Sequence, residues 1–462
     1  MAQKRNICLI NDSFPPAIDG VASAVVNYAG EIQKHYGRAT VVTPYYPDAD
    51  DSAFPFPVVR YPSLDVTKLV GYRAGVPLSP ELLRRLDEGR FDLIHTHCPV
   101  SSTILARMLR ERLNVPVVFT YHTKFDVDIA NAMHNKLLQE TSIKLLVDNI
   151  SACDEVWTVS RGAGENLRSL GFRGSYRIMH NGVDFPAGRL PEAAVRGVGR
   201  GLDLPEGVPV LLFVGRIMWY KGLKIILDAL KALQIEGRPF RMVFVGRGTD
   251  ETEVRAYARK LGLTKQVLFL PPVYDRGIIR AWYCRADLFL FPSTFDTNGL
   301  VVREAAACGL ASVLIAGSCA AEDVTNGRNG FLIRENAASM AAMLRRLLAD
   351  LPLVRRVGEN AQRELYLSWE SAVANACRRY EAVLENFKAG RYPPRRALSE
   401  TLLKGTAGSL EAIGSVKDLS QQVYRSVDNG VRQLQESPWV QENYRLLREK
   451  MAQLRQRLDR YL

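Results

Sequence analysis

Two series of short apolar segments, each separated by segments of helical periodicity, follow one another along residues 1–390. In the first series the apolar runs are 6–10, 39–43, 93–95, 115–120 and 155–159, and the helical ones are 21–33, 103–113 and 135–149. In the second series, apolar runs at 209–214, 241–245, 267–270 and 288–291 alternate with helical segments at 222–234, at 251–261 and from about 299. Two longer amphipathic segments follow, at 337–351 and 371–387. Short apolar strands between helices predict parallel, doubly wound sheets, so we expect an α/β fold with two Rossmann-like units.

The segment 181–209 is interrupted by glycine and proline, which is typical of a linker. We therefore divide the chain into an N-terminal domain (1–185), a C-terminal domain (206–372), a crossover helix (373–390) and a helical tail (391–462). In the tail, apolar residues recur at spacings of three and four between Val440 and Tyr461. We expect this tail to dock on its own chain or on a second copy in a homodimer, and a basic membrane contact is the alternative.

Composition limits the classes of protein to which the chain can belong. Hydrophobic residues make up 47% and charged residues 24% of its 462 residues, as in ordinary globular proteins. The seven cysteines lack paired spacing and no apolar run is long enough for a signal peptide or a membrane span, so we expect a cytoplasmic protein. The chain has 61 basic and 49 acidic residues, and this excess of positive charge favours an anionic partner. No nucleic-acid-binding motif accompanies this charge, so nucleic acid is disfavoured.

A first candidate binding site follows the apolar run 209–214. The strand ends in Gly215, and two cations, Arg216 and Lys221, precede a helix that begins near Gly222. A guanidinium, an ammonium and helix amides suit a diphosphate group. The alternative is a pair of solvated surface cations.

A second candidate is the segment 291–305, in which Asp296 and Glu304 stand eight residues apart across a loop-to-helix junction. Carboxylates accept hydrogen bonds from sugar hydroxyl groups, and the loop amides between the two acids can face an anion. The alternative is that Asp296 caps the helix and that Glu304 lies on its solvated face.

Several motifs together identify a family, and they lie at 15–20, 120–123, 159–160, 180–184, 214–222, 287–292 and 296–305. In this order they resemble the retaining, nucleotide-sugar-dependent glycosyltransferases of family 4. The Asp-Thr-Asn-Gly-Leu loop at 296–300 is similar to that of bacterial diacylglycerol glucosyltransferases. The resemblance covers roughly residues 5–390. It implies the GT-B fold, in which two Rossmann-like domains face each other.

The resemblance also implies a role for each matching residue. The catalytic group would comprise His122, Arg216, Lys221 and Asp296, with the two cations on the donor diphosphate and His122 over the donor sugar. Asp296 would bind the transferred hexose and Glu304 the ribose. The remaining donor contacts would be Gly20 at the phosphates, Val273 at the nucleobase, and the backbone of Asn298, Gly299, Leu300 and Val301 at the sugar and phosphates.

Two residues depart from the family pattern. Asp296 replaces the usual glutamate, and Asp19 stands where a second glycine is common. Neither a metal nor another cofactor is implied, because the family handles the diphosphate without a metal. The pair His95 and His97 lacks a suitably spaced fourth ligand for zinc, and we expect His97 to line a cleft instead.

These observations lead to a functional expectation. We expect a retaining glycosyltransferase that moves a hexose, glucose in the first instance, from a UDP-linked donor to a lipid such as diacylglycerol at the inner face of the plasma membrane. A helix carrying Arg107, Arg110 and Arg112 motivates contact with an anionic membrane surface. The alternatives are transfer to a soluble sugar, a polysaccharide or phosphatidylinositol, and a GT-B-shaped binding or scaffold protein without turnover.

Overall fold

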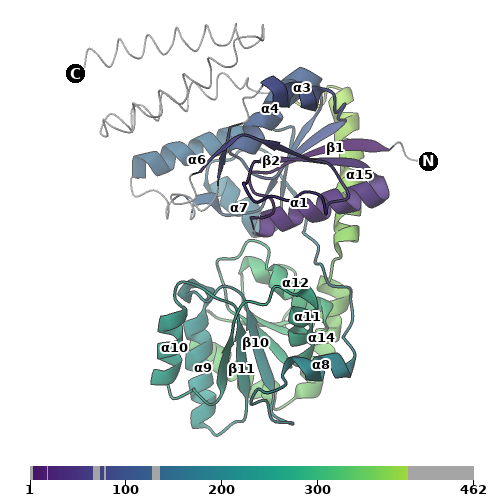
Figure 1. The fold of residues 1–462 in the computed structure, drawn as a ribbon. Coiled ribbons are helices and arrows are strands. Elements are labelled where there is room, and N and C mark those ends of the chain that lie inside the picture. The colour runs from purple at the N-terminus through teal and green to yellow at the C-terminus, as the bar shows by residue number, and fades with distance from the viewer. Residues whose placement is uncertain are drawn as a thin grey trace. The chain divides into compact units, whose positions relative to one another are not determined.

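The computed structural model describes residues 4–17, 19–65, 73–76, 80–126, 129 and 136–393. The predicted helical tail therefore lies outside the described residues, apart from 391–393. The described chain forms two units, each with its own parallel sheet (Figure 1). The first unit comprises the described residues up to Val159, Ala163–Met179 and those from Val373 onward, and the second comprises Ser160–Gly162 and His180–Ala372.

The sheet of the first unit has seven parallel strands in the order β3-β2-β1-β6-β7-β8-β9. Its strands are β1 (Arg5–Ile10), β2 (Gly37–Pro44), β3 (Val58–Tyr61), β6 (Leu93–Thr96), β7 (Val117–Tyr121), β8 (Glu155–Thr158) and β9 (Arg177–Ile178). The helices are α1 (Gly20–Glu31), the π-helical turn η1 (Ile32–Tyr36), α3 (Pro80–Asp87), α4 (Ser101–Leu113), α6 (Lys136–Ser151) and α7 (Arg161–Ser169), with a short β4 (Ser63–Leu64) and β5 (Ala74–Gly75) pair. Strands β6 and β7 are buried throughout, as expected where helices cover both faces of a parallel sheet.

The sheet of the second unit has six parallel strands in the order β12-β11-β10-β13-β14-β15. These are β10 (Val210–Val214), β11 (Arg241–Val245), β12 (Val267–Leu270), β13 (Leu288–Phe291), β14 (Ser312–Ile315) and β15 (Phe331–Ile333). The helices are α8 (Glu192–Val198), η2 (Trp219–Lys221), α9 (Leu223–Ile235), α10 (Glu251–Lys260), α11 (Arg276–Arg285), α12 (Leu300–Ala307), η3 (Cys319–Ala321), α13 (Ala337–Leu348), α14 (Leu351–Leu365) and α15 (Trp369–Lys388). Helix α15 begins in the second unit and continues into the first.

The expected fold class is confirmed, and most strands lie where the apolar runs predicted them. The predicted end of one helix is wrong. The segment 337–351 was expected to be one helix, but α13 ends at Leu348, because the side chain of Asp350 accepts a hydrogen bond from the amide of Leu353 and so caps a new helix, α14. The predicted linker contains helix α8. Helix α11, which was not predicted, begins after Asp275, whose carboxylate accepts hydrogen bonds from the amides of Gly277 and Ile278.

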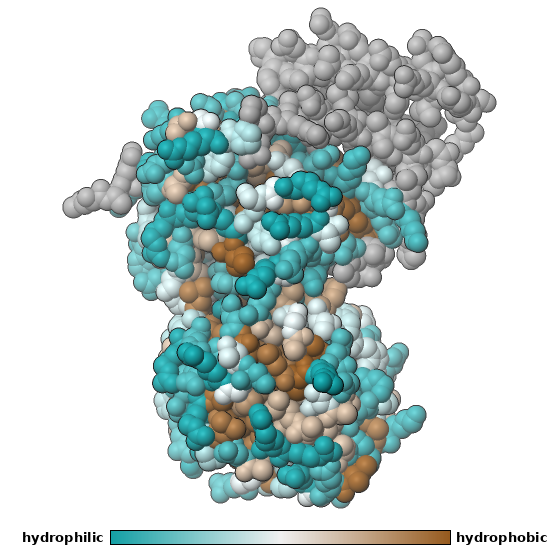
Figure 2. Space-filling view, turned by 180° about the vertical axis from the view of Figure 1, so that it is seen from behind, coloured by the Kyte–Doolittle hydropathy of each residue, from teal (hydrophilic) through white to brown (hydrophobic). Residues whose placement is uncertain are grey.

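Hydrophilic residues cover most of the face drawn in Figure 2, and apolar residues gather there in small groups, mainly on the second unit. Within the described residues, no helix combines the length and the apolar character needed to cross a membrane.

Candidate active site

A largely buried polar cluster of the second unit forms where β10 and β13 end. These strands are parallel neighbours, so their carboxyl ends lie at the same edge of the sheet, where ligands bind in such folds. Lys221 follows β10 and Asp296 follows β13. The Lys221 Nζ lies 2.7 and 2.8 Å from the two carboxylate oxygens of Asp296. Two of the predicted site residues therefore meet, although 75 positions separate them along the chain.

This ion pair is largely removed from water. The side chain of Lys221 is 7% exposed and that of Asp296 is 23% exposed. Burial lowers the pKa of Lys221, and the carboxylate of Asp296 opposes that shift. The hydroxyl of Ser293 donates a hydrogen bond of 2.5 Å to Asp296, which holds the carboxylate in place. Asp296 is thus a partner of Lys221, and the alternative that it caps α12 is wrong.

Aromatic rings surround the ammonium group of Lys221. Its Nζ lies 5.5 Å from the ring centre of Tyr220, 5.7 Å from that of Phe291 and 5.8 Å from that of Phe295. Tyr220 and Phe295 also contact each other, with ring centres 4.7 Å apart. Rings at these distances stabilise a cation and exclude water from it, so the positive charge faces a poorly solvated space.

Arg216 lies in the turn after β10 and is exposed. It is close enough to Lys221 for its charge to lower the pKa of that residue further. The turn is fixed by the neighbouring loop after β11, because the amide of Ile217 donates to the carbonyl of Arg247 and the amide of Trp219 donates to Asp250. A rigid turn thus presents two cations at the same edge of the sheet.

The loops that carry Lys221 and Asp296 touch at Gly222. This residue has φ +76°, and a Cβ there would overlap the carbonyl oxygen of Pro292. Gly237 has φ +70° but nothing lies within 4 Å of the position of its Cβ. Of these two glycines, Gly222 alone combines a left-handed backbone with close contact between the two loops.

We expect Gly222→Ala to lower the thermal unfolding midpoint clearly more than the matched control Gly237→Ala. The control adds only the backbone cost of a left-handed alanine, about 1–2 kcal/mol. Gly222→Ala must also push apart the loops that hold the ion pair, so hexosyl transfer falls as well. Equal midpoints for the two variants would contradict this view of the contact.

Glu304 lies one turn into α12 and is held by two side chains of α11. Its Oε1 accepts a hydrogen bond of 2.5 Å from Arg276, and its Oε2 accepts one of 2.9 Å from the hydroxyl of Tyr283. Arg276 and Tyr283 are seven residues apart and share one face of their helix. The alternative of a solvated Glu304 is wrong, because its side chain is 12% exposed.

Burial raises the pKa of Glu304, while Arg276 and Tyr283 act in the opposite direction. Arg276 also lies 3.4 Å from Asp184 and over the ring of Phe185, with 4.4 Å between its Cζ and the ring centre. Sequence reasoning did not identify Arg276 or Tyr283. The cap at Asp275 was the available signal, since it predicts a helix start that places both residues on one face.

The start of α12 supplies the backbone groups expected to bind the donor. Gly299 precedes the helix with φ +57°, and a Cβ there would press against Ala320. Leu300 and Val301 are the first two helical residues, so their amides lie among those without a partner inside the helix. The side-chain amide of Asn298 is enclosed, and neither its oxygen nor its nitrogen has a hydrogen-bond partner among the described residues. Enclosed amides of this kind normally bind a ligand or water. Val273 follows β12 and is half-buried.

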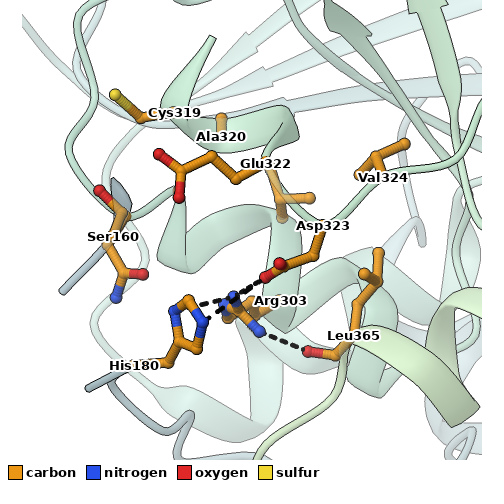
Figure 3. A pocket seen from close by; sticks show the side chains of 12 residues that line it. Ser160, His180, Arg303, Cys319, Ala320, Glu322, Asp323, Val324 and Leu365 are labelled. Atoms are coloured by element: carbon orange, nitrogen blue, oxygen red, sulfur yellow. Dashed lines mark hydrogen bonds and ion pairs between the residues drawn. The ribbon is translucent and has the colours of Figure 1, made fainter. Parts of the chain in front are cut away.

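A small polar cavity of about 20 Å³ lies behind this helix start, within the second unit (Figure 3). Arg303 crosses it and donates hydrogen bonds to the carbonyl of Leu365 at 2.9 Å and to Asp323 at 2.7 Å. His180 approaches the same guanidinium, with 3.3 Å between its Nδ1 and the nearer nitrogen. Asn298 and Gly299 also line this cavity, so it adjoins the loop expected to bind the donor, and the pairing of Arg303 with Asp323 supports the start of α12.

The other two predicted site residues, Gly20 and His122, belong to the first unit. Gly20 is the first residue of α1, and the carboxylate of Asp19 accepts hydrogen bonds of 2.8 and 2.7 Å from the amides of Val21 and Ala22. Asp19, which departs from the family pattern, is thus the N-cap of α1. His122 follows β7 and is buried, with 6% exposure. Burial lowers its pKa to about 3, so its imidazole is neutral at physiological pH.

The three arginines of α4 do not form a free basic surface. The guanidinium of Arg110 pairs with Asp154 at 2.8 Å, and that of Arg112 pairs with Asp87. Arg107 is buried and donates a hydrogen bond of 2.7 Å to Asn149. Their charge is used to hold the first unit together, so this helix gives no support to membrane contact.

Comparison with known proteins identifies the family to which this arrangement belongs. The model of Glycosyltransferase Family 4 matches residues 18–185, and that of Glycosyl transferases group 1 matches residues 200–364. D-inositol 3-phosphate glycosyltransferase 2 of Catenulispora acidiphila is 30% identical over 322 residues, which cover 66% of this chain and 74% of that protein. The chain belongs to glycosyltransferase family 4. It is a hexosyltransferase that uses a nucleotide sugar as donor, so the expected family and enzyme class are confirmed.

Other matches to this family 4 glycosyltransferase differ in their named substrates. The alpha-monoglucosyldiacylglycerol synthase of Streptococcus pneumoniae is 23% identical over 308 residues, covering 66% of this chain and 69% of that enzyme. The crystal structure of Anabaena HepE in complex with UDP-glucose has a TM-score of 0.63 at 19% identity and covers 82% of this chain and all of HepE. That likeness shows the fold, and the GT-B architecture expected from the sequence is confirmed.

Proposed function

We propose that this family 4 glycosyltransferase transfers a hexose, with retention of anomeric configuration, from a UDP-linked donor to a lipid acceptor of the diacylglycerol class. The observation that carries the donor half is the convergence of Lys221, Asp296 and the buried Glu304 on the loops and helix that follow β10 and β13. Two cations, two hydrogen-bonded carboxylates and a helix start at one sheet edge match the parts of a nucleotide sugar.

Each part of the donor then has a partner. Arg216 and Lys221 bind the diphosphate and stabilise the charge that develops on the leaving group. Asp296 keeps Lys221 in position and has lone pairs left to accept hydrogen bonds from the hexose. Glu304, held by its two α11 partners, accepts hydrogen bonds from the ribose hydroxyls.

The resemblance adds further contacts to this proposal. They are Val273 for the base, the backbone from Asn298 to Val301 for the sugar and phosphates, Gly20 for the phosphates, and His122 for the sugar. The UDP portion is supported by the structural neighbour that binds UDP-glucose. No metal enters the proposed chemistry, because the cations of the chain face the diphosphate.

The names of two relatives suggest different acceptors for this chain. The loop at 296–300 and the S. pneumoniae enzyme favour diacylglycerol, with the chain acting at the cytoplasmic face of the membrane. The C. acidiphila relative favours a soluble acceptor, an inositol phosphate, and the internal pairing of the α4 arginines agrees better with this second candidate.

Donor and acceptor are tested in one assay with the purified full-length chain and hexose-labelled UDP-glucose. One reaction contains anionic vesicles with dioleoylglycerol, and a matched reaction contains D-inositol 3-phosphate. We expect label to pass into the organic extract of the vesicle reaction and not into the inositol product. Label only in the aqueous product overturns the lipid acceptor. Binding of UDP, seen as a rise in thermal midpoint, without transfer or hydrolysis of UDP-, ADP- or GDP-hexoses overturns the catalytic proposal and favours a binding protein.

A further inference from the structure

Three buried histidines lie next to one another near the carboxyl ends of β6 and β7 in the first unit. His95 and His97 have ring centres 4.0 Å apart, and those of His97 and His122 are 5.2 Å apart. His95 uses both of its nitrogens, with the Tyr380 hydroxyl 2.6 Å from Nδ1 and the Thr120 hydroxyl 2.7 Å from Nε2. His95 is therefore fully engaged in joining α15 to the sheet.

His97 lies directly against the proposed sugar-binding histidine. Its Nδ1 is 2.9 Å from the Nε2 of His122. His97 is 1% exposed, and its Nε2 has no hydrogen-bond partner among the described residues. Its backbone amide donates to the carbonyl of Ile10, which fixes its position on the sheet. The contact with His122 is thus the only side-chain hydrogen bond that the described residues offer to His97.

This geometry determines which nitrogen carries the proton. A neutral imidazole has one N–H group and one bare nitrogen. If His122 donated, His97 would carry its own proton on Nε2, as a buried N–H group without an acceptor. Orphaned buried N–H groups are rarer than orphaned acceptors, because their desolvation is uncompensated. The favoured arrangement has Nδ1–H of His97 donating to Nε2 of His122, which leaves the proton of His122 on Nδ1.

We propose that His97 is a positioning residue that fixes the orientation and the Nδ1–H tautomer of His122 for hexosyl transfer. This inference rests on the proposed function, since it needs His122 to act on the donor sugar. His97 itself acts through His122. The expectation that His97 lines a cleft is replaced by this role, because its side chain is enclosed.

Three substitutions separate the hydrogen bond from simple filling of space. The side chain of asparagine places an amide near the position of the imidazole Nδ1, that of glutamine reaches the position of Nε2, and leucine only fills volume. We expect His97→Leu and His97→Gln to lower kcat by about 10- to 100-fold, the cost of a misplaced reacting group, with the donor KM nearly unchanged. His97→Asn is expected to recover most of the loss. His95→Asn is the matched control for loss of a buried histidine, and it should lower the thermal midpoint without altering His122.

Side-chain ¹⁵N NMR of the histidine-labelled chain, which has six histidines, reports the tautomer independently of turnover. We expect the His122 signals to show protonated Nδ1 in the wild type and in His97→Asn, and protonated Nε2 or a mixture in His97→Leu. An unchanged tautomer in His97→Leu overturns the inference even if transfer is confirmed. So does a His97→Asn variant that keeps the wild-type tautomer but is as slow as His97→Leu. If transfer itself is not found, the proposed function fails and the NMR result still decides the hydrogen bond.

Discussion

Replacing Lys221 by methionine is expected to slow hexosyl transfer by about 100- to 1,000-fold, the effect of removing one preorganised group that faces developing negative charge. The ammonium group is enclosed by three aromatic rings and held by Asp296, so water cannot replace it easily. Methionine keeps the volume of the side chain and removes only the charge. The loss of activity should therefore appear in kcat, and the unpaired carboxylate of Asp296 adds a separate loss of folding stability.

The measurement is steady-state transfer of the hexose from UDP-glucose, with Lys224→Met as matched control. Lys224 lies three residues further along, is 62% exposed and pairs with Asp228. We expect it to keep wild-type activity. Because Lys221→Met leaves Asp296 without its cation, Lys221→Met with Asp296→Leu tests whether folding is responsible. The double variant should regain the thermal midpoint, which would assign any loss of stability in Lys221→Met to the unpaired carboxylate. Activity is compared only among Lys221→Met, Lys224→Met and the wild type, because Asp296 is itself proposed to bind the hexose. Wild-type transfer by Lys221→Met would exclude the proposed site.

The sequence predicted the fold well because parallel strands covered on both sides are nearly continuous apolar runs. Strand β13 is buried at all of its four positions and was found from its apolar run. The meeting of Lys221 and Asp296 was also predictable in principle, since both follow strands whose carboxyl ends share one edge. The sequence pattern was therefore sufficient to predict a contact wherever the order of the strands in the sheet determines which residues meet.

The sequence did not predict the contacts in which a side chain is held by a residue of another helix or loop. Three arginines on one helix predict a basic face, yet Arg110 and Arg112 are paired with Asp154 and Asp87, which are far away in the sequence. Asp19 departed from the family pattern without explanation until the structure showed that it caps α1. The same is true of α11, whose role becomes visible only when Arg276 and Tyr283 are seen to hold Glu304.

Substitution of Glu304 is the second change for which we expect a large effect, in this case on donor binding. Glu304→Gln is expected to weaken donor binding by about 10- to 100-fold, since a hydrogen bond to a charged group contributes about 1.5–3 kcal/mol. The amide keeps the shape of the side chain but has one acceptor atom and no charge to hold Arg276. Calorimetric titration with UDP measures this loss directly. Glu335→Gln serves as the control, because Glu335 is exposed and lies outside the site. Equal affinity of Glu304→Gln and the wild type would remove Glu304 from the ribose site.

The pH dependence of binding tests the same assignment with a defined sign. Burial raises the pKa of Glu304, and the hydroxyl of Tyr283 acts against this rise. Donor binding uses the carboxylate, so affinity should fall as pH falls through the raised pKa. Tyr283→Phe removes the opposing hydrogen bond, which raises the pKa further and moves the loss of affinity to higher pH.

Stability should respond to pH in the opposite direction. Because the pKa of Glu304 is higher in the folded chain than in the unfolded one, its contribution to the free energy of unfolding is fully present below the unfolded pKa and is lost as pH rises through the folded pKa. In Glu304→Gln the contributions of this carboxyl group to both pH dependences should disappear together. A pH profile of UDP affinity that is unchanged in Glu304→Gln and in Tyr283→Phe would assign the titration to another group.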